Sequence, residues 1–276
     1  MLTFDCGEPQ GRPLILMFHR VVPRHELRTR LVARPRFEMS SERFADVLRE
    51  LPRMGYSVVS LDELAARLAD GRPTRQLAAI TFDDGFSDVV LHALPLLEQY
   101  RAPFTLYVTT GYPERRLMHI SAAIEEQVVK QDGVLELELL GSRVRLPVRS
   151  AAEKVAALQH LEGLAFSRFA SIADAARAFG FDPLAHASTV LGWEELAMLA
   201  RHPLCTLGAH TANHPDLTSR PRDEVRRELS ESNALLSAVL GRAPVHFAYP
   251  FGKYDATARE EGFRAGYRVI VKTGRA

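Results

Sequence analysis

Two adjacent carboxylates, Asp83 and Asp84, stand in the segment Thr-Phe-Asp-Asp-Gly at residues 81–85. The apolar residues 77–80 come directly before them and predict a buried strand that runs into a turn. The simpler interpretation is structural, because Asp-Gly is common in turns and Asp side chains hydrogen-bond their own backbone there. The chemical interpretation is that the pair lies at the end of a strand, where α/β proteins commonly build their sites.

Two histidines, His210 and His214, follow a second apolar run at residues 204–208. Imidazoles four residues apart meet on one face if the segment turns helically. With one carboxylate they would form a metal site of two histidines and one aspartate that has room for water. The two clusters together therefore favour a metal centre over an ordinary turn.

Two further polar clusters also follow apolar runs. His19 ends the run at residues 14–18, and the segment His-Phe-Ala-Tyr-Pro-Phe-Gly at residues 246–252 comes after the turn-forming residues 241–244. All four clusters are thus expected where strands end. In a parallel sheet these ends meet at one edge.

The elements that must position these side chains alternate between strand and helix. The spacing of Ser60 and Glu63 is that of a helix-capping box, and Pro221 begins a long helix that ends near Gly241. Strands are expected at residues 14–18, 57–59, 78–82, 104–108, 204–208, 245–249 and 267–271. This order predicts a parallel sheet closed into an irregular (β/α) barrel of about seven strands, with the site at its C-terminal mouth.

The length of the chain, 276 residues, predicts a single barrel domain over residues 1–276. The stretch at about 112–192 is longer than a usual connection and is interpreted as an insertion beside the mouth. It has helical periodicity at 155–164 and an alternating pattern at 134–146 that predicts a hairpin across Gly141-Ser142. A packing role without contact to substrate is the alternative.

Three segments, in this order, resemble the polysaccharide deacetylase family, also called carbohydrate esterase family 4. They are TFDDG at 81–85, HTANHPDL at 210–217 and FAYPFG at 247–252. The resemblance covers about 14–110 and 192–271. It implies a hydrolase that removes N- or O-acetyl groups from sugars with one divalent metal ion, of which zinc is expected and cobalt, nickel or manganese are alternatives.

The resemblance implies a role for each matching residue. Asp83 corresponds to the general base, and Asp84, His210 and His214 correspond to the metal ligands. The backbone amide of Phe251 corresponds to a donor that holds the oxyanion. Together these groups would activate water and stabilise the charge that develops on the acetyl oxygen.

The chain departs from the family pattern in two places. Ala248 stands where many relatives have an arginine that orients the base, and no histidine follows His246 to serve as the C-terminal general acid. A branch that includes poly-N-acetylglucosamine deacetylases takes its acid from an N-terminal Tyr-His-Arg-Val-like segment. Residues 18–21, Phe-His-Arg-Val, are similar to it, so His19 is the candidate acid. An ordinary histidine at a strand end is the alternative.

Arginine is concentrated after His19. Arg20, Arg24, Arg28, Arg30, Arg34 and Arg36 are opposed only by Glu26. Such a run is usually a solvated loop. The functional alternative is a grip on an anionic glycan, a nucleotide-linked or lipid-linked precursor, or an anionic membrane surface. Arg20 and Tyr249 are candidate substrate-binding residues.

The composition excludes some classes of protein. The formal net charge is +1 and no nucleic-acid-binding motif occurs, so nucleic acid is not an expected partner. No apolar stretch reaches the length of a membrane span, and residues 1–13 lack the order of a secretory signal. The two cysteines agree with a reducing compartment. A cytoplasmic protein is expected, with contact to the inner membrane face or removal of a leading signal as alternatives.

The sequence as a whole predicts a metal-dependent deacetylase that acts on an N-acetylated glycan or its precursor, as in the synthesis of cell-surface polysaccharides. An amidase with the same residues and a small non-sugar substrate is one alternative. A catalytically silent glycan-binding protein is a second. A non-haem iron oxygenase also uses two histidines and a carboxylate, but it would leave Asp83 without a role.

Overall fold

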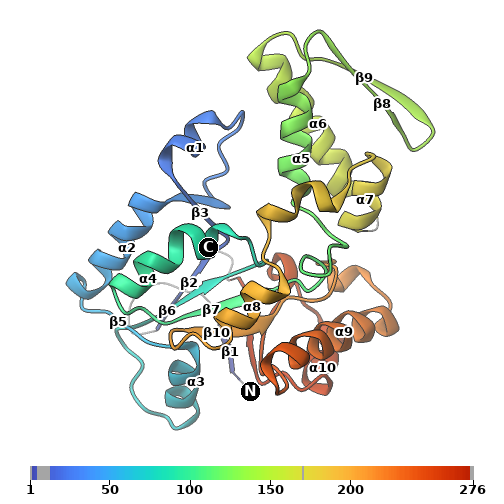
Figure 1. The fold of residues 1–276 in the computed structure, drawn as a ribbon. Helices are drawn as coiled ribbons and strands as arrows, with labels where there is room; N and C mark the ends of the chain where they lie inside the picture. The colour runs from blue at the N-terminus through green and yellow to red at the C-terminus, as the bar shows by residue number, and fades with distance from the viewer. Residues whose placement is uncertain (1, 5–12, 170, 274–276) are drawn as a thin grey trace.

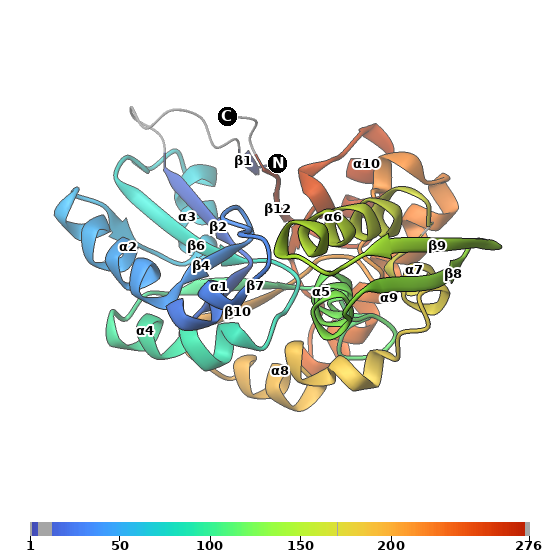
Figure 2. The same cartoon turned by 90° about the horizontal axis from the view of Figure 1, so that it is seen from above.

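The computed structural model describes residues 2–4, 13–169 and 171–273. Its central layer is a curled sheet in which every pairing is parallel (Figures 1 and 2). In spatial order the strands are β1 (Leu2–Phe4), β12 (Val269–Val271), β11 (His246–Ala248), β10 (Cys205–Ala209), β7 (Phe104–Val108), β6 (Leu77–Phe82) and β2 (Leu14–Phe18), and β5 (Ser57–Val58) also pairs with β6.

Helices pack on the outer face of this sheet and bury the larger of its two apolar clusters. They are α2 (Ser41–Arg53), η1 and α4 (Val89–Ala93 and Leu94–Gln99), α8 (Trp193–Leu199), α9 (Arg222–Leu240) and α10 (Ala256–Arg264). A further helix, α3 (Leu61–Ala69), packs instead against the inner face and closes it at the lower end in Figure 1.

Successive residues of each strand alternate between the two faces. On β6, Ile80 and Phe82 belong to the outer cluster, whereas Leu77 and Ala79 belong to the inner one. Asp83 is therefore the next inward position beyond the end of the strand. The two-residue period of the strand aims its carboxylate into the hollow of the sheet.

The same rule places two histidines. His19 lies four residues after Ile15, which packs on the inner cluster. His210 lies two residues after Gly208, where an added Cβ would come within 2.7 Å of the inward-facing ring of Tyr107. Glycine at that position leaves room for the tyrosine, and the alternation then turns His210 inward at the end of β10.

The strands expected at seven positions are all present, and their boundaries lie within two residues of those expected. The sheet is a half-barrel, since the pairings found in the described ranges leave β1 and β2 at its two ends. The expected (β/α) barrel is confirmed in this curled form, but not its closure. A cavity of about 190 Å³ separates β2 from β11 and β12. Ile15 and Met17 line it on one side, and Ala248 and Val271 line it on the other.

The expected helix boundaries are also present. Ser60 caps α3 by accepting a hydrogen bond from the Glu63 amide at 3.1 Å. The helix expected after Pro221 is α9, and it ends at Gly241, whose left-handed backbone (φ 67°) glycine adopts without strain.

Residues 20–40, here called the arm, connect the barrel to the insertion. The arm consists of β3 (Arg20–Val22), α1 (Arg24–Thr29) and β4 (Glu38–Ser40), and β3 pairs with β4 in parallel. Arg34 in the arm donates hydrogen bonds to Glu125 at 2.7 Å and to Glu162 at 2.8 Å. The arm is thereby fixed against two helices of the insertion.

The insertion (residues 112–192) rises over one end of the sheet in Figure 1 and has an apolar core of its own. Its elements are α5 (Ile120–Lys130), β8 (Val134–Leu139), β9 (Ser142–Pro147), α6 (Ala151–Ser167), α7 (Ile172–Ala178) and η2 (Pro183–Thr189). The expected helix and hairpin are both present, but the turn is Leu140-Gly141, one residue earlier than expected. Both turn residues have positive φ, 55° and 74°, as the tight turn of a two-residue hairpin requires.

Within the described ranges, no helix has the length and apolar character needed to cross a membrane.

Candidate metal centre

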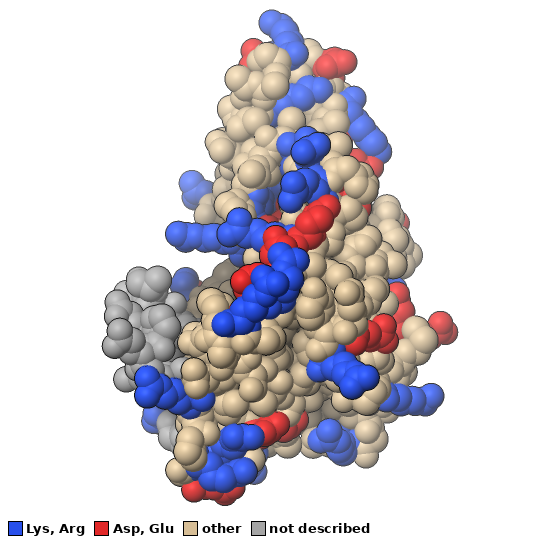
Figure 3. All heavy atoms as spheres, turned by 90° about the vertical axis from the view of Figure 1, so that its left-hand side faces the viewer, with Lys and Arg blue, Asp and Glu red and all other residues tan. Residues whose placement is uncertain are grey.

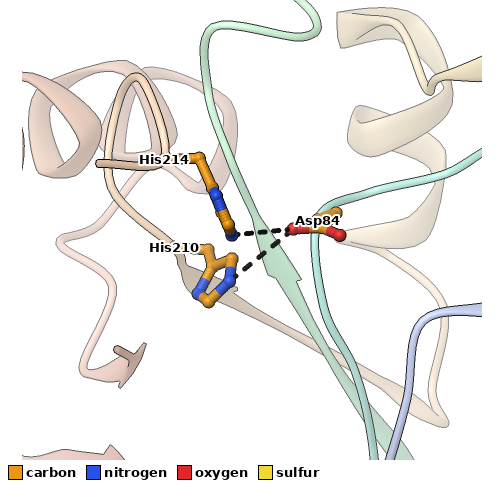
Figure 4. A group of neighbouring side chains, drawn as sticks. All are labelled: Asp84, His210 and His214. Atoms are coloured by element: carbon orange, nitrogen blue, oxygen red, sulfur yellow. Dashed lines mark ion pairs between the residues drawn. The ribbon is translucent and has the colours of Figure 1, made fainter. Parts of the chain in front are cut away.

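Asp84, His210 and His214 come together at the mouth of the half-barrel (Figure 4). One ligand atom from each lies within 4.8 Å of the others. Asp84 Oδ1 is 3.3 Å from His214 Nε2 and 3.6 Å from His210 Nε2. Two ligands about 2.1 Å from a tetrahedral zinc ion lie roughly 3.4 Å apart, so the spacing suits a shared metal ion.

The surroundings of these atoms also fit a metal. Asp84 Oδ1 is buried and accepts no hydrogen bond from any described residue. His210 uses Nδ1 to donate to the Ala248 carbonyl at 2.9 Å, which turns Nε2 toward Asp84. A backbone carbonyl on the second ring nitrogen is a common support for a metal-binding histidine. Ala248 thus serves the site through its backbone.

The backbone of the site is unusual. Asp84, Thr211, His214 and Phe251 all have positive φ, between 55° and 76°. A helical turn is not what brings His210 and His214 together: the segment between them is a loop that contains left-handed residues. The Thr211 hydroxyl accepts from the His214 amide at 3.0 Å and donates to the His210 carbonyl at 2.5 Å. Strained backbone of this kind is typical of functional sites.

Glu228 on α9 supports this loop from behind. Its carboxylate accepts from the Ala212 and Asn213 amides at 3.0 and 2.8 Å, and from the Asn213 side chain at 2.7 Å. Glu228 carries no signal in the sequence, because it stands in an ordinary run of charged helix residues and outside every motif.

Burial sets the charge of the two histidines. It lowers the pKa of His210 to about 3 and that of His214 to about 4. Both rings are therefore neutral at pH 7, with a lone pair free to bind a metal ion.

Asp83 lies beside the triad and is 6% exposed. Its amide donates to the Phe18 carbonyl at 2.9 Å, which joins the end of β6 to the end of β2. Burial, and then the charge of Asp84, raise the pKa of the Asp83 carboxyl well above its usual value. Its Oδ1 atom is buried without a partner among the described residues, so this carboxylate is not used to hold the fold together.

One cavity of about 600 Å³ contains all the residues expected to act chemically. Its walls include the triad, Asp83, His19 and Phe251. The His19 ring packs on Phe37, with the ring centroids 4.8 Å apart, and its Nδ1 atom has no partner in the described part of the chain. A second carboxylate and a third imidazole thus share the space in front of the metal-type cluster.

A family model described as polysaccharide deacetylase matches residues 70–270, which is well over half of the chain. The chain belongs to the polysaccharide deacetylase family. The resemblance inferred from the motifs is confirmed, and with it the expected enzyme class: a hydrolase that removes acetyl groups from carbohydrates. The family depends in general on a metal ion, and Asp84, His210 and His214 form the candidate site for one in this deacetylase.

Solved structures of deacetylases share the fold. Streptococcus pyogenes deacetylase PplD in complex with acetate has a TM-score of 0.59 and 20% identity, over 94% of this chain and 82% of that chain. A de-N-acetylase from Aggregatibacter actinomycetemcomitans has a TM-score of 0.59 and 14% identity, over 96% and 89%. IcaB from Ammonifex degensii has a TM-score of 0.59 and 19% identity, over 96% and 84%. No curated protein sequence matches the deacetylase.

Phe251, the expected oxyanion donor, lies next to His214 of the triad. It has φ 58°, and its ring packs on His214 with the centroids 4.7 Å apart. The side chain is 56% exposed and lines the cavity. The position of Phe251 is compatible with the expected role of its amide, which stays a prediction.

Two weaker candidates of the sequence analysis lie elsewhere. Arg20 is not among the residues that line the large cavity, and its guanidinium donates to Asp88 at 2.6 Å and to Glu38 at 2.9 Å. Tyr249 is buried, packs on Tyr254, and lines the small cavity next to Asp83. The contacts of Arg20 and Tyr249 do not support a role in binding substrate. That role stays a prediction for both residues.

The insertion supplies a wall of the large cavity that was not expected from the motifs. The residues concerned are Tyr112, His119, Ile120, Ser121, Phe166 and Ile172. They belong to no motif, and only the position of the insertion beside the mouth indicated that this segment could reach the site.

Proposed function

We propose that this deacetylase is a zinc-dependent N-deacetylase of an acetylated glycan or glycan precursor. Asp84, His210 and His214 would hold the ion, which when bound would polarise the acetyl carbonyl and make a water molecule more acidic. The observation that carries the proposal is the shared cavity, where the three ligands, Asp83 and His19 meet.

Each side chain then has a task in hydrolysis of the acetamide. Asp83, which has no structural partner on Oδ1, accepts the proton of the attacking water. The Phe251 amide donates a hydrogen bond to the oxygen on which negative charge develops. His19 gives a proton to the departing sugar nitrogen, because an amine is a poor leaving group without one.

The nature of the acyl bond is supported by one of the structural neighbours. The protein from Aggregatibacter actinomycetemcomitans is named a de-N-acetylase, and its structure covers 96% of this chain. A substrate with an N-acetyl group is therefore proposed ahead of an O-acetyl ester. The cytoplasmic location and the form of the glycan, polymer or linked precursor, stay predictions from the sequence.

Elemental analysis after dialysis against metal-free buffer tests the proposal. Wild-type protein should retain about one zinc ion, and His210→Ala should lose it together with acetate release from an N-acetylglucosamine oligosaccharide. Iron as the sole metal would support an oxygenase instead, and absence of any metal after reloading would support a silent binding protein.

His19→Ala separates the proposed acid from an ordinary strand-end histidine. A general acid contributes about 10²-fold or more when the leaving group needs a proton. The variant should therefore lose much more activity on an N-acetyl sugar than on an acetyl ester whose alcohol leaves readily as an anion. His25→Ala, an exposed histidine in the arm, is the matched control. Equal losses on both substrates would remove His19 from the mechanism.

A further inference from the structure

The wall of the cavity formed by the insertion contains the first turn of α5. His119 is the residue that precedes this helix, and Ile120 and Ser121 are its first two residues. All three line the cavity that also holds the triad. In Figure 1 the helix stands over the barrel, with the hairpin of the insertion beyond it.

The first turn of a helix offers hydrogen-bond donors. The leading amides of an α-helix have no partner within the helix, and the helix dipole adds partial positive charge at this end. No side chain caps α5, so the His119 side chain is not used for that purpose. Ile120 and Ser121 line the cavity, and their amides have no acceptor among the described residues.

His119 is a second and independent sign of a ligand. Its side chain lines the cavity, yet the residue is only 7% exposed. Neither ring nitrogen has a hydrogen-bond partner in the described part of the chain. A buried imidazole left unsatisfied in this way carries a free-energy cost that a bound group would relieve.

The ring of His119 is held in place by apolar neighbours. It packs on Phe86 and Phe37, with centroid separations of 4.9 and 5.7 Å. Burial, and then nearby arginines that include Arg20 and Arg34, lower its pKa well below the usual value. At pH 7 the ring is therefore neutral and offers one N–H donor.

The charges around this turn favour an anion. Arg34 and Arg36 of the arm line the same cavity. Arg34 is neutralised by Glu125 and Glu162, whereas Arg36 is exposed and forms no ion pair within the described ranges. Figure 3 shows Lys and Arg side chains, with some acidic ones among them, gathered across the middle of the face on which the arm lies.

Negative charges in the same cavity come from Asp83 and Asp84. These would repel a second anion, but a divalent ion held by the triad offsets them. Glu125, one turn further along α5, uses its carboxylate on Arg34 and the Leu31 amide. The start of α5 is thus the part of the cavity wall where donors outnumber acceptors.

We propose that the start of α5, with His119 and Arg36, is an oxyanion-binding subsite for a phosphate or carboxylate group carried by the acetylated sugar. The inference rests on the proposed function, since the same substrate would place its acetyl group at the triad. It assigns the insertion a role in selecting anionic substrates, and Arg36 is the arginine of the arm that takes part.

Kinetics with matched substrates test the subsite. Acetate release is measured for N-acetylglucosamine, its 6-phosphate and N-acetylmuramic acid. The second sugar tests a phosphate group and the third tests a carboxylate group. Wild-type protein should prefer at least one anionic sugar by on the order of tenfold in kcat/KM, mostly through KM. His119→Ala should abolish that ratio, His119→Gln should retain part of it, and His25→Ala should keep it. Equal kcat/KM for all three sugars, or an unchanged ratio in His119→Ala, would overturn the subsite.

Binding of inorganic phosphate to the metal-loaded protein gives a readout that needs no turnover. Thermal shift measures it, because an anion that binds only the folded state raises Tm. Phosphate at the subsite should be lost in zinc-loaded His119→Ala and kept in zinc-loaded His25→Ala. Phosphate on the metal ion alone would still bind to His119→Ala and would contradict the subsite. If no sugar releases acetate but the first pattern is seen, the proposed function fails and the subsite stands.

Discussion

The cavity of this deacetylase has two walls that are built differently. The barrel wall consists of residues at the ends of paired strands: β6 and β10 have a neighbouring strand on each side, and β2 pairs with β6 at the end of the sheet. The insertion wall consists of residues on helices whose apolar core is separate from that of the barrel. One wall contains the metal-type cluster and the unpartnered carboxylate, and the other contains no metal-type cluster among its described residues. This division suggests that chemistry and substrate selection can change independently.

Loss of Asp83 should have the largest effect on the barrel wall. Asp83→Asn removes the proposed base but keeps the size of the side chain and leaves all three candidate ligands in place. We expect acetate release to fall by about 10²- to 10⁴-fold while zinc content stays unchanged. Asp46→Asn, an exposed aspartate on α2, is the control. Loss of zinc together with activity would show that Asp83 binds the metal and would contradict the assignment.

Loss of a core side chain tests the independence of the insertion. Leu161 on α6 is fully buried in the core of the insertion. Leu161→Ala should destabilise this segment by about 2–4 kcal/mol, because it removes methyl groups and leaves a cavity. Unfolding of the insertion, followed by hydrogen exchange of α5 and α6 amides, should become easier, while zinc remains bound. An equal loss of protection on β6 and β10 would show that the two walls unfold as one unit.

The barrel wall could largely be predicted from the sequence, because its residues obey local rules. Asp83 and His210 follow apolar runs, and a strand of known period aims the next residue to a known side. The support given by the Ala248 carbonyl and by Glu228 could not be predicted, since it depends on where β11 and α9 pass behind the loop. Their side chains give no signal of that contact.

The insertion wall was beyond prediction for a related reason. The helix and the hairpin were expected from periodicity, but periodicity does not say which end of α5 meets the cavity. His119 precedes α5 as a lone histidine in an unremarkable segment. Its importance arises from burial between Phe37 and Phe86, which come from the arm and from the loop after β6.

The support behind the metal-type cluster can be weakened without touching a ligand. Glu228→Gln leaves one carbonyl oxygen to serve three donors of the loop between the two histidines. We expect the affinity for zinc to fall about tenfold, as for other groups that position ligands indirectly. Titration against a chelator measures it, and Glu231→Gln, on the same helix, is the control. Unchanged affinity would mean that the left-handed residues Thr211 and His214 hold the loop by themselves.

The smallest effect is expected in the hairpin of the insertion, and it tests how far the insertion wall extends. Leu140 occupies a left-handed turn position with φ 55° and is 63% exposed, so its side chain gains little from packing. Leu140→Gly should relieve strain and stabilise the insertion by up to about 1 kcal/mol, after the entropy that glycine loses on folding. The melting temperature of the insertion should rise slightly, and kcat/KM should stay unchanged, if the hairpin only completes the core around α6. A change in kcat/KM for the anionic sugars without a change in zinc affinity would instead show that the hairpin contacts the substrate. The insertion wall would then extend beyond the first turn of α5.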